Sequence, residues 1–302
     1  MNVIELNGIT KTYGNHKAVD DLTLHVPKGS IYGFIGPNGS GKTTTIRMIM
    51  NILYPDNGNI LLFGQELIGS RLEHVGYLPE ERGLYKKMKV KDLIKFYGEL
   101  KGVVDLDRTA DEWLKKFDLT KWADKKVEAL SKGMSQKVQF IITVIDQPDL
   151  IILDEPFSGL DPVNAEIIKE EILRLQSRGS TIIFSTHDMS VAEKMCDYIF
   201  MIYKGKKVLD GTLNSIQEKF GHDTLRVQTE TGMSAYEGIP GIERVNDFGQ
   251  IQEVKMDPHT DSQEVLKALM AKTKVFKFEL TSPSLNDIFI RIARPENTED
   301  HE

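Results

Sequence analysis

Apolar residues recur along this chain in two spacings, one typical of strands and one typical of helices. Continuously apolar runs at 150–153 and 181–184 predict the strands Leu150–Leu153 and Thr181–Ser185, and suit a parallel sheet covered on both faces. Further strands are predicted at Leu22–Val26, Ile31–Ile35, Asn59–Phe63 and Tyr198–Tyr203. Helical spacing is found at Val90, Leu93, Ile94 and Tyr97, and again at Ile167, Ile168, Ile172 and Leu175. Strands and helices therefore alternate, which predicts an α/β fold.

One segment interrupts this alternation. Residues of about 85–147 contain no good strand pattern, so they are expected to form a helical subdomain inserted into the α/β core. Pro148 and Asp149 then end the insertion and return the chain to the sheet. The predicted first domain covers residues 1–220.

After residue 220 the pattern changes to that of a small α+β domain, expected at 221–294. Strands are predicted at Thr224–Thr229, Gln252–Met256 and Val275–Leu280, and helices at Ser262–Ala271 and Asn286–Ala293. The last stretch, 295–302, is acidic and is expected to be disordered.

Composition narrows the class of protein. The chain has 302 residues, 27% of them charged, and a net charge of −7, and no apolar run approaches the ~20 residues of a membrane helix. The opening residues carry neither a basic leader nor an apolar stretch, so a cytoplasmic protein is expected. Cys196 is the only cysteine, which excludes an intramolecular disulfide. The acidic balance argues against a nucleic-acid partner.

Residues 36–43 read GPNGSGKT and fit the phosphate-binding pattern G-x-x-x-x-G-K-[ST]. The octet follows the predicted strand Ile31–Ile35 and opens a predicted helix at 44–53, which is the setting that phosphate binding needs. Backbone N–H groups of the loop would surround phosphate oxygens, Lys42 would reach the β- and γ-phosphates, and the Thr43 hydroxyl would ligate Mg²⁺. The residues expected to bind the nucleotide here are Gly36, Asn38, Gly39, Ser40, Gly41, Lys42, Thr43 and Thr44.

Two further segments carry candidate chemistry. The apolar strand at 150–153 ends in Asp154 and Glu155, at the edge where α/β sheets bind ligands, so Asp154 is placed to hold Mg²⁺ and Glu155 to activate a water. Ser131 and Gly133 precede a predicted helix running to about Ile145. They are read either as an ordinary helix cap or as a second anion site at the positive end of that helix.

These segments, in this order, resemble the ATP-binding-cassette (ABC) ATPase family over residues 3–217. The matching segments are GPNGSGKT, YLPEE at 77–81, LSKGMSQK at 130–137, LIILDEP at 150–156, SGLD at 158–161 and STHDM at 185–189. The resemblance implies a P-loop NTPase core with a helical subdomain, with ATP and Mg²⁺ as cofactors.

The resemblance also implies roles for single residues. Tyr13 resembles the aromatic residue that stacks on adenine, His187 the switch that contacts the γ-phosphate and the attacking water, and Asp161 the residue that links two subunits. Ser131 and Gly133 would contact the γ-phosphate of the opposite subunit's ATP. Hydrolysis therefore implies a head-to-tail dimer, of identical or different ATPase subunits.

The chain departs from the family pattern in two places. Lys132 and Met134 replace the third and fifth residues of the usual LSGGQ signature, while Ser131 and Gly133 remain. Glu80 stands where a Gln usually contacts the metal, and an ionised carboxylate accepts hydrogen bonds but cannot donate them.

The resemblance implies the ATPase subunit of a membrane transporter, bound to the inner face of the membrane beneath permease subunits on separate chains. The segment YLPEERGLY and the helices after it resemble the part that contacts the permease, and the C-terminal domain resembles the tail of bacterial exporter-type ATPases, including sodium-efflux systems. Two alternatives remain open: an ABC ATPase outside transport, and a regulatory cassette acting on a soluble complex.

Overall fold

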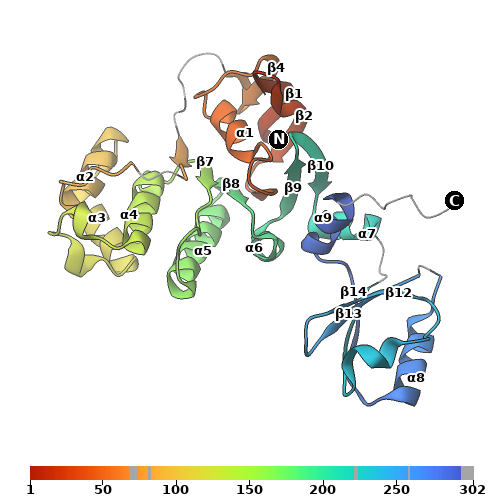
Figure 1. Cartoon of the computed structure of the whole chain (residues 1–302). Coiled ribbons are helices and arrows are strands. Elements are labelled where there is room, and N and C mark those ends of the chain that lie inside the picture. The colour runs from red at the N-terminus through yellow and green to blue at the C-terminus, as the bar shows by residue number, and fades with distance from the viewer. Residues whose placement is uncertain (68–71, 73, 81–82, 221–223, 258, 294–302) are drawn as a thin grey trace. The chain divides into compact units, whose positions relative to one another are not determined.

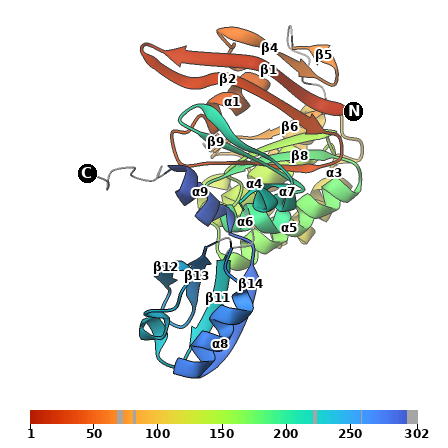
Figure 2. The same cartoon turned by 90° about the vertical axis from the view of Figure 1, so that its right-hand side faces the viewer.

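The computed structural model describes residues 1–67, 72, 74–80, 83–220, 224–257 and 259–293 of the chain, shown in Figures 1 and 2. The chain divides into two compact units, Met1–Gly211 and Thr212–Glu302. The division falls one helix earlier than the boundary expected after residue 220. The tail at 295–302 lies outside the described residues, as do Glu81 and Arg82 of the segment YLPEERGLY.

The first unit contains two sheets. A four-stranded antiparallel sheet has the order β2-β1-β4-β5, and a six-stranded sheet has the order β10-β9-β3-β8-β7-β6, parallel except for β10. The strands are β1 (Asn2–Tyr13), β2 (His16–Pro27), β3 (Ile31–Ile35), β4 (Asn57–Leu62), β5 (Gln65–Glu66), β6 (Val75–Leu78), β7 (Leu150–Asp154), β8 (Thr181–Thr186), β9 (Tyr198–Tyr203) and β10 (Lys206–Gly211).

Every residue of β3, β7 and β8 is buried, as expected for central strands covered on both faces. One core packs the strands of the antiparallel sheet, such as Leu6 and Leu24, against Phe34 of β3 and Phe200 of β9. The other core packs Leu153 and Phe184 against helices. The carboxyl ends of the parallel strands β3, β7 and β8 lie side by side, so the loops that follow them share one edge of the sheet.

The helices of the first unit are α1 (Lys42–Ile49), α2 (Val90–Leu100), α3 (Leu106–Lys116), α4 (Lys132–Val144), α5 (Pro162–Ser177) and α6 (Met189–Met195). The predicted helix at 44–53 is shorter than expected, because Asn51 takes a left-handed φ of 54° directly after the cap residue Met50. The helical insertion is present, with α2 packed on α3 and α4; two 3₁₀ turns, Thr120–Trp122 and Val127–Ala129, lie between α3 and α4.

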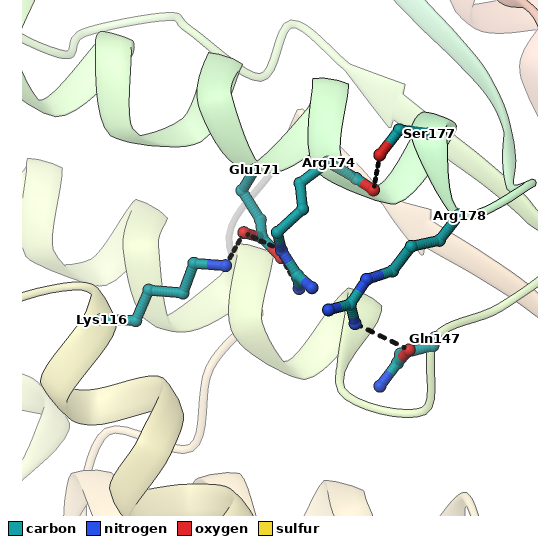
Figure 3. Close-up of polar contacts among 6 residues, drawn as sticks. All are labelled: Lys116, Gln147, Glu171, Arg174, Ser177 and Arg178. Carbon is teal, nitrogen blue, oxygen red and sulfur yellow. Dashed lines mark hydrogen bonds and ion pairs between the residues drawn. The ribbon is translucent and has the colours of Figure 1, made fainter.

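A charged contact ties the helical subdomain to the core (Figure 3). The Glu171 carboxylate of α5 is 1% exposed and accepts hydrogen bonds from Lys116 at the end of α3 and from Arg174, whose Nε lies 2.8 Å from Oε2. Arg178, one turn further along, donates to the side chain of Gln147 over 3.4 Å. The helix α5 that begins at Asp161 is thereby held to the end of α3 and to the loop before β7.

The second unit is a small α+β domain of the predicted kind. Its sheet has the order β12-β13-β11-β14 and is antiparallel throughout. Its elements are α7 (Leu213–Lys219), β11 (Thr224–Thr229), the 3₁₀ helix η3 (Gly232–Tyr236), β12 (Ile242–Asp247), β13 (Gln252–Met256), α8 (Ser262–Lys272), β14 (Val275–Thr281) and α9 (Leu285–Ala293). From β11 to β14 the order is that of a β-α-β-β-α-β unit, with η3 in the place of the first helix.

Helix α7 belongs with the second unit because its contacts lie there. The Gln217 amide donates to the Pro283 carbonyl over 2.9 Å, and Arg291 of α9 donates to the Phe220 carbonyl that follows α7. These contacts account for a division before α7 instead of after it. Within the described residues, no helix combines the length and the apolar character needed to cross a bilayer.

Candidate nucleotide-binding and hydrolysis site

The loop between β3 and α1 has a backbone that requires glycine at both ends. Gly36 has a φ of 148°, and a Cβ there would lie 2.3 Å from the Ile202 carbonyl oxygen. Gly41 has a φ of 114°, and a Cβ there would lie 2.4 Å from the Ala18 carbonyl oxygen. A side chain at either position would therefore displace a neighbouring strand backbone. The two glycines that define the sequence pattern are thus fixed by packing as well as by conformation.

Lys42 lies inside this loop and is 6% exposed. Its amine donates to the carbonyl oxygens of Gly36 (2.7 Å) and Pro37 (3.2 Å). Burial lowers the pKa of the Lys42 amine, while the nearby carboxylates of Glu155 and Asp154 act in the opposite direction. The amine is therefore held at the centre of the loop, where phosphate oxygens can replace the two carbonyls as its acceptors.

A cavity of about 380 Å³ opens beside the loop and brings together most of the predicted site. Its walls come from the end of β1, the start of β2, the loop after β3, the start of α1 and the end of β7, with Glu80 from the loop after β6. The predicted residues that line it are Tyr13, Asn38, Gly39, Ser40, Gly41, Lys42, Thr43, Thr44, Glu80, Asp154 and Glu155. His16 and Ala18 of β2 also line it and were not predicted, because nothing in their local sequence marks them.

Asp154 ends β7 and is 1% exposed. The Ser185 hydroxyl, at the paired position of β8, donates to its Oδ1. Within the part of the chain that the structure describes, Oδ2 of Asp154 is buried and accepts no hydrogen bond. Such an atom costs about 1–3 kcal/mol unless a partner satisfies it. A buried carboxylate oxygen in a cavity beside a threonine hydroxyl fits the oxygen ligands that Mg²⁺ takes.

Glu155 follows with a left-handed φ of 50°, which is uncommon for a residue other than glycine. Its N–H donates to the Ser185 hydroxyl oxygen over 3.1 Å, so the same serine contacts both acidic residues. The His187 ring nitrogen Nδ1 lies 2.9 Å from Oε1 of Glu155. Because an ionised carboxylate only accepts, the His187 Nδ1–H is the donor. Glu155 is thus held at its backbone by Ser185 and at its side chain by His187.

Tyr13 and Glu80 lie at the mouth of the cavity. Tyr13 is the last residue of β1, lines the cavity and is 49% exposed. Glu80 is also exposed. Thr43 and Thr44, in the first turn of α1, are half-buried. The Tyr13 ring and the loop thus line the same cavity.

Gly36 and His187 do not line the cavity themselves but bond to Lys42 and Glu155, which do. The other predicted residues, at the starts of α4 and α5, lie outside it. The Ser131 hydroxyl accepts from the Met134 N–H over 3.2 Å and caps α4. The Asp161 carboxylate accepts from the Asn164 N–H over 3.0 Å and caps α5, and these hydrogen bonds lower the pKa of Asp161. A Cβ on Gly133 would lie 3.5 Å from Leu160, just before Asp161. The two helix starts therefore lie close together, with Ser131 and Asp161 exposed.

A glycine-rich loop between a buried parallel strand and a helix, together with acidic residues at the end of β7, two positions away in the same sheet, defines the class of P-loop nucleotide-binding proteins. Residues 19–158 match the ABC transporter family model, and residues 211–293 match the model of the ATP-binding protein DrrA1-3-like C-terminal domain. Together with a relative that is 40% identical over 95% of this chain, these matches show that the chain belongs to the ABC transporter ATP-binding protein family.

Relatives match over nearly the whole chain. YhaQ of Bacillus subtilis strain 168, an uncharacterized ABC transporter ATP-binding protein, is 40% identical over 95% of this chain and 97% of its own length. The linearmycin resistance ATP-binding protein LnrL of the same organism is 30% identical over 96% of this chain and 98% of its own length. A solved ATP-binding subunit of an ABC transporter superimposes with a TM-score of 0.68 and 29% identity, over 72% of this chain and 93% of the other. The resemblance inferred from the motifs is confirmed.

Proposed function

We propose that this chain binds ATP with Mg²⁺, hydrolyses it as one half of a dimer, and thereby powers export through permease subunits encoded as separate chains. The observation that carries the proposal is the composition of one cavity. It joins the buried amine of Lys42, the unsatisfied Oδ2 of Asp154 and a Glu155 side chain held by His187. These are a phosphate-binding cation, a metal-binding oxygen and a base for water.

Nucleotide binding begins at the mouth of the cavity. Tyr13 stacks on the adenine, and the loop N–H groups of 36–44 close around the phosphates at the positive end of α1. Lys42 exchanges its two loop carbonyls for oxygens of the β- and γ-phosphates. The negative charge of the phosphates then compensates the positive charge of the buried Lys42 amine.

Three residues are proposed to hold the metal: the Thr43 hydroxyl, the Asp154 carboxylate and, at the cavity mouth, Glu80. Mg²⁺ held by these residues would supply positive charge against the β- and γ-phosphates. Ser185 fixes the orientation of Asp154, so the free oxygen of that carboxylate points where no other group of the described protein satisfies it.

Hydrolysis uses the pair of Glu155 and His187. Glu155 accepts a proton from water as the water oxygen bonds to the γ-phosphorus and the bond to the bridging oxygen breaks, which yields ADP and inorganic phosphate. His187 holds the carboxylate through Nδ1–H, over 2.9 Å. Its other nitrogen donates to an oxygen of the γ-phosphate in the doubly protonated form of the ring, in which both nitrogens are donors. The exposed His187 ring, 60% accessible, is open to that contact.

Dimerisation supplies the residues that lie outside the cavity. Ser131, Gly133 and Asp161 stand near one another at the starts of α4 and α5, and the first and last of them are exposed. We place them against the ATP of a second subunit, in a head-to-tail dimer of identical or different chains. Ser131 and Asp161 cap the positive ends of α4 and α5, so a phosphate of the second subunit's ATP would approach both helix starts.

A permease partner is supported by exposed aromatic residues in the helical subdomain. Tyr85 is 55% exposed and Phe96 is 37% exposed, and their rings lie 6.0 Å apart at an angle of 85°. Exposed apolar clusters of this kind mark protein contacts. We place the chain at the inner face of the membrane on this ground.

The names of its relatives favour export: they include a lantibiotic transport protein of Streptococcus pyogenes and a Nod factor export protein of Cupriavidus metallidurans.

Two measurements test the proposal. Glu155→Gln should keep nucleotide affinity and lower ATP turnover by a factor of roughly 10²–10⁴, the contribution typical of a positioned general base. Glu166→Gln, an exposed change of the same kind on α5, is the matched control and should turn over normally. A Glu155→Gln protein that hydrolyses ATP at the unaltered rate would remove Glu155 as the base.

The second measurement separates transport from the two alternatives, an ABC ATPase outside transport and a regulatory cassette. Purification from native membranes should recover a multi-span membrane protein, and Tyr85→Ala with Phe96→Ala should weaken that association without changing the ATP affinity. Recovery of a soluble complex only would favour the alternatives.

A further inference from the structure

Strand β14 forms one edge of the sheet in the second unit and is bonded to β11 on its other side. It exposes two large apolar side chains, Phe276 (56%) and Leu280 (49%). Beside it, Met270 of α8 is 66% exposed and lines a groove of about 450 Å³ together with Leu266, Phe276 and Phe278. Figure 2 shows α8 lying along this strand. A long apolar edge strand of this kind is a template for pairing with another strand.

The two faces of β14 differ in chemistry. Leu280 pairs with Leu225 of β11, which is fully buried in the core beneath α8, so Leu280 lies on the helix-covered face. Glu279 pairs with Arg226 and lies on the opposite face, where the Lys277 amine is 2.7 Å from its carboxylate. Apolar residues therefore mark one face of the strand, and a cation followed by an anion marks the other.

The sequence of β14, VFKFELT, is self-complementary about Phe278. We propose that two copies of this chain associate by pairing β14 with β14 in antiparallel register centred on Phe278. In that register Phe276 faces Leu280 of the second copy, and Lys277 faces Glu279 of the second copy. Both pairs occur twice in the dimer, as a two-fold interface requires.

This register keeps each pair on a single face of the combined sheet. Directly opposite side chains on an antiparallel pair have Cβ atoms about 4.5–5.5 Å apart, which suits both an apolar contact and an ion pair. Because the two-fold axis stands perpendicular to the sheet, both copies of α8 lie on the same face. Met270 of each copy is then next to the apolar side of the joined strands.

The charge pattern of β14 indicates that the partner at its free edge is a second copy of this chain. Shifting the register by one residue on each strand would place Lys277 opposite Lys277 or Glu279 opposite Glu279, which is unfavourable. The other edge strand, β12, has no such symmetry: its sequence is IERVND, and it exposes Glu243 and Arg244 in place of large apolar residues. The two edges therefore differ in the way that a specific self-pairing predicts.

Charge reversals test the register on the full chain without nucleotide and with EDTA, so that ATP-driven dimerisation plays no part. Lys277→Glu and Glu279→Lys each place like charges opposite one another twice, and each should weaken dimerisation by about tenfold or more, measured by sedimentation velocity. Mixing the two variants makes both pairs complementary again and should restore the dimer. Lys121→Glu, an equal change of charge at an exposed position of the first unit, is the control and should leave dimerisation unchanged.

The mixture is the decisive sample because folding defects in a single variant would not be repaired by mixing. Equal weakening of the single variants and of their mixture would overturn the proposal. So would full dimerisation of both single variants, or a wild-type chain that stays monomeric across the concentration range of the method.

Disulfide trapping tests the register of the same contact independently. In a Cys196→Ser background, Lys277→Cys and Glu279→Cys proteins should cross-link when mixed, because opposite Cα atoms lie within the 4.4–6.8 Å of a disulfide. Each variant alone should cross-link far less, since its diagonal separation is about 7–8 Å. Equal cross-linking in all three samples, or none in the mixture, would overturn the register. Neither result bears on the ATP site, which lies in the first unit.

Discussion

Ser185 organises the acidic end of the candidate site through two hydrogen bonds. Its hydroxyl donates to Asp154 and accepts the Glu155 N–H over 3.1 Å, and the residue is fully buried. The metal-binding oxygen and the proposed base are thus positioned by one side chain. The sequence contains a signal for it only in retrospect, as the first residue of the segment STHDM.

We predict that Ser185→Ala lowers ATP turnover about 10- to 100-fold while nucleotide affinity changes little, because misplacing a catalytic group by about 1 Å can cost that much. Ser180→Ala is the matched control. Ser180 lies just before β8, and its buried hydroxyl donates to the Pro148 carbonyl over 2.8 Å. Both variants lose buried hydrogen bonds, so their melting temperatures should be similar. Only Ser185→Ala should have lower ATP turnover. Equal turnover in the two proteins would contradict the positioning role.

Glu80 is the residue at which this chain departs from its family inside the cavity. A glutamine there would offer an amide N–H, whereas the ionised carboxylate offers only acceptors. We predict that ATP turnover depends more steeply on Mg²⁺ in the wild type than in Glu80→Gln, since the added negative charge favours the metal and disfavours metal-free nucleotide. Turnover and nucleotide affinity across a magnesium titration measure this. Superimposable curves would place Glu80 outside the metal site and leave it to contact the permease.

At the scale of elements, helix α5 connects two functional regions. It begins at Asp161, on the proposed dimer face, and carries Glu171 toward Lys116 of the helical subdomain (Figure 3). A buried carboxylate with two cationic partners is costly to break, because removing the anion leaves Lys116 and Arg174 facing each other.

We predict that Glu171→Gln destabilises the protein by about 2 kcal/mol, the range of a lost hydrogen bond to a charged group. This corresponds to a fall of several degrees in melting temperature for a domain of this size. The adjacent Glu170→Gln removes an exposed charge from the same helix and should leave the melting temperature almost unchanged. Similar thermal unfolding of both variants would show that the contact in Figure 3 adds little.

Elements with a strong local pattern were predicted well. The bounds of β3, β9, β11 and β13 agree with the prediction, because continuous or alternating apolar residues define them. Several strands were missed, among them β1, β6, β10 and β12. Strand β6 has four residues including Gly76, where a Cβ would lie 2.7 Å from the Thr143 carbonyl. Its conformation comes from parallel pairing with β7, which no local pattern records.

At the scale of the whole molecule, each unit has a hydrophobic core of its own. The nucleotide cavity is lined by residues between Tyr13 and Glu155, all in the first unit. In the second unit, Leu225 and Val254 of the sheet pack in one core with Leu269 of α8. Nucleotide binding should therefore not depend on the second unit.

We predict that a chain ending at Gly211 binds ATP with the affinity of the full chain, measured by calorimetry with a non-hydrolysable analogue. A chain ending at Lys219 would keep α7, whose Ile216 is fully buried and whose Gln217 bonds Pro283. It should be less soluble, because that apolar side chain loses its cover. Loss of nucleotide affinity in a folded chain of residues 1–211 would contradict the assignment.

The sequence by itself determined the loop, its strand and helix, and the family. The reason is that these features depend on residues close together along the chain. Gly36, Gly41, Lys42 and Thr43 lie within eight consecutive residues, and the backbone conformation requires glycine at the first two positions. Asp154 and Glu155 could be predicted as site residues for the same reason, because they directly follow an apolar run that forms a strand.

Only the tertiary structure decided which distant residues meet. Ser185 reaches Asp154 because β7 and β8 pair in parallel register, and His16 lines the cavity because β2 folds back on β1. The symmetry of VFKFELT was present in the sequence, yet it has consequences only because β14 lies at an edge. Contacts between strands far apart along the chain depend on register and sheet order, and these are set by the packing of the whole unit.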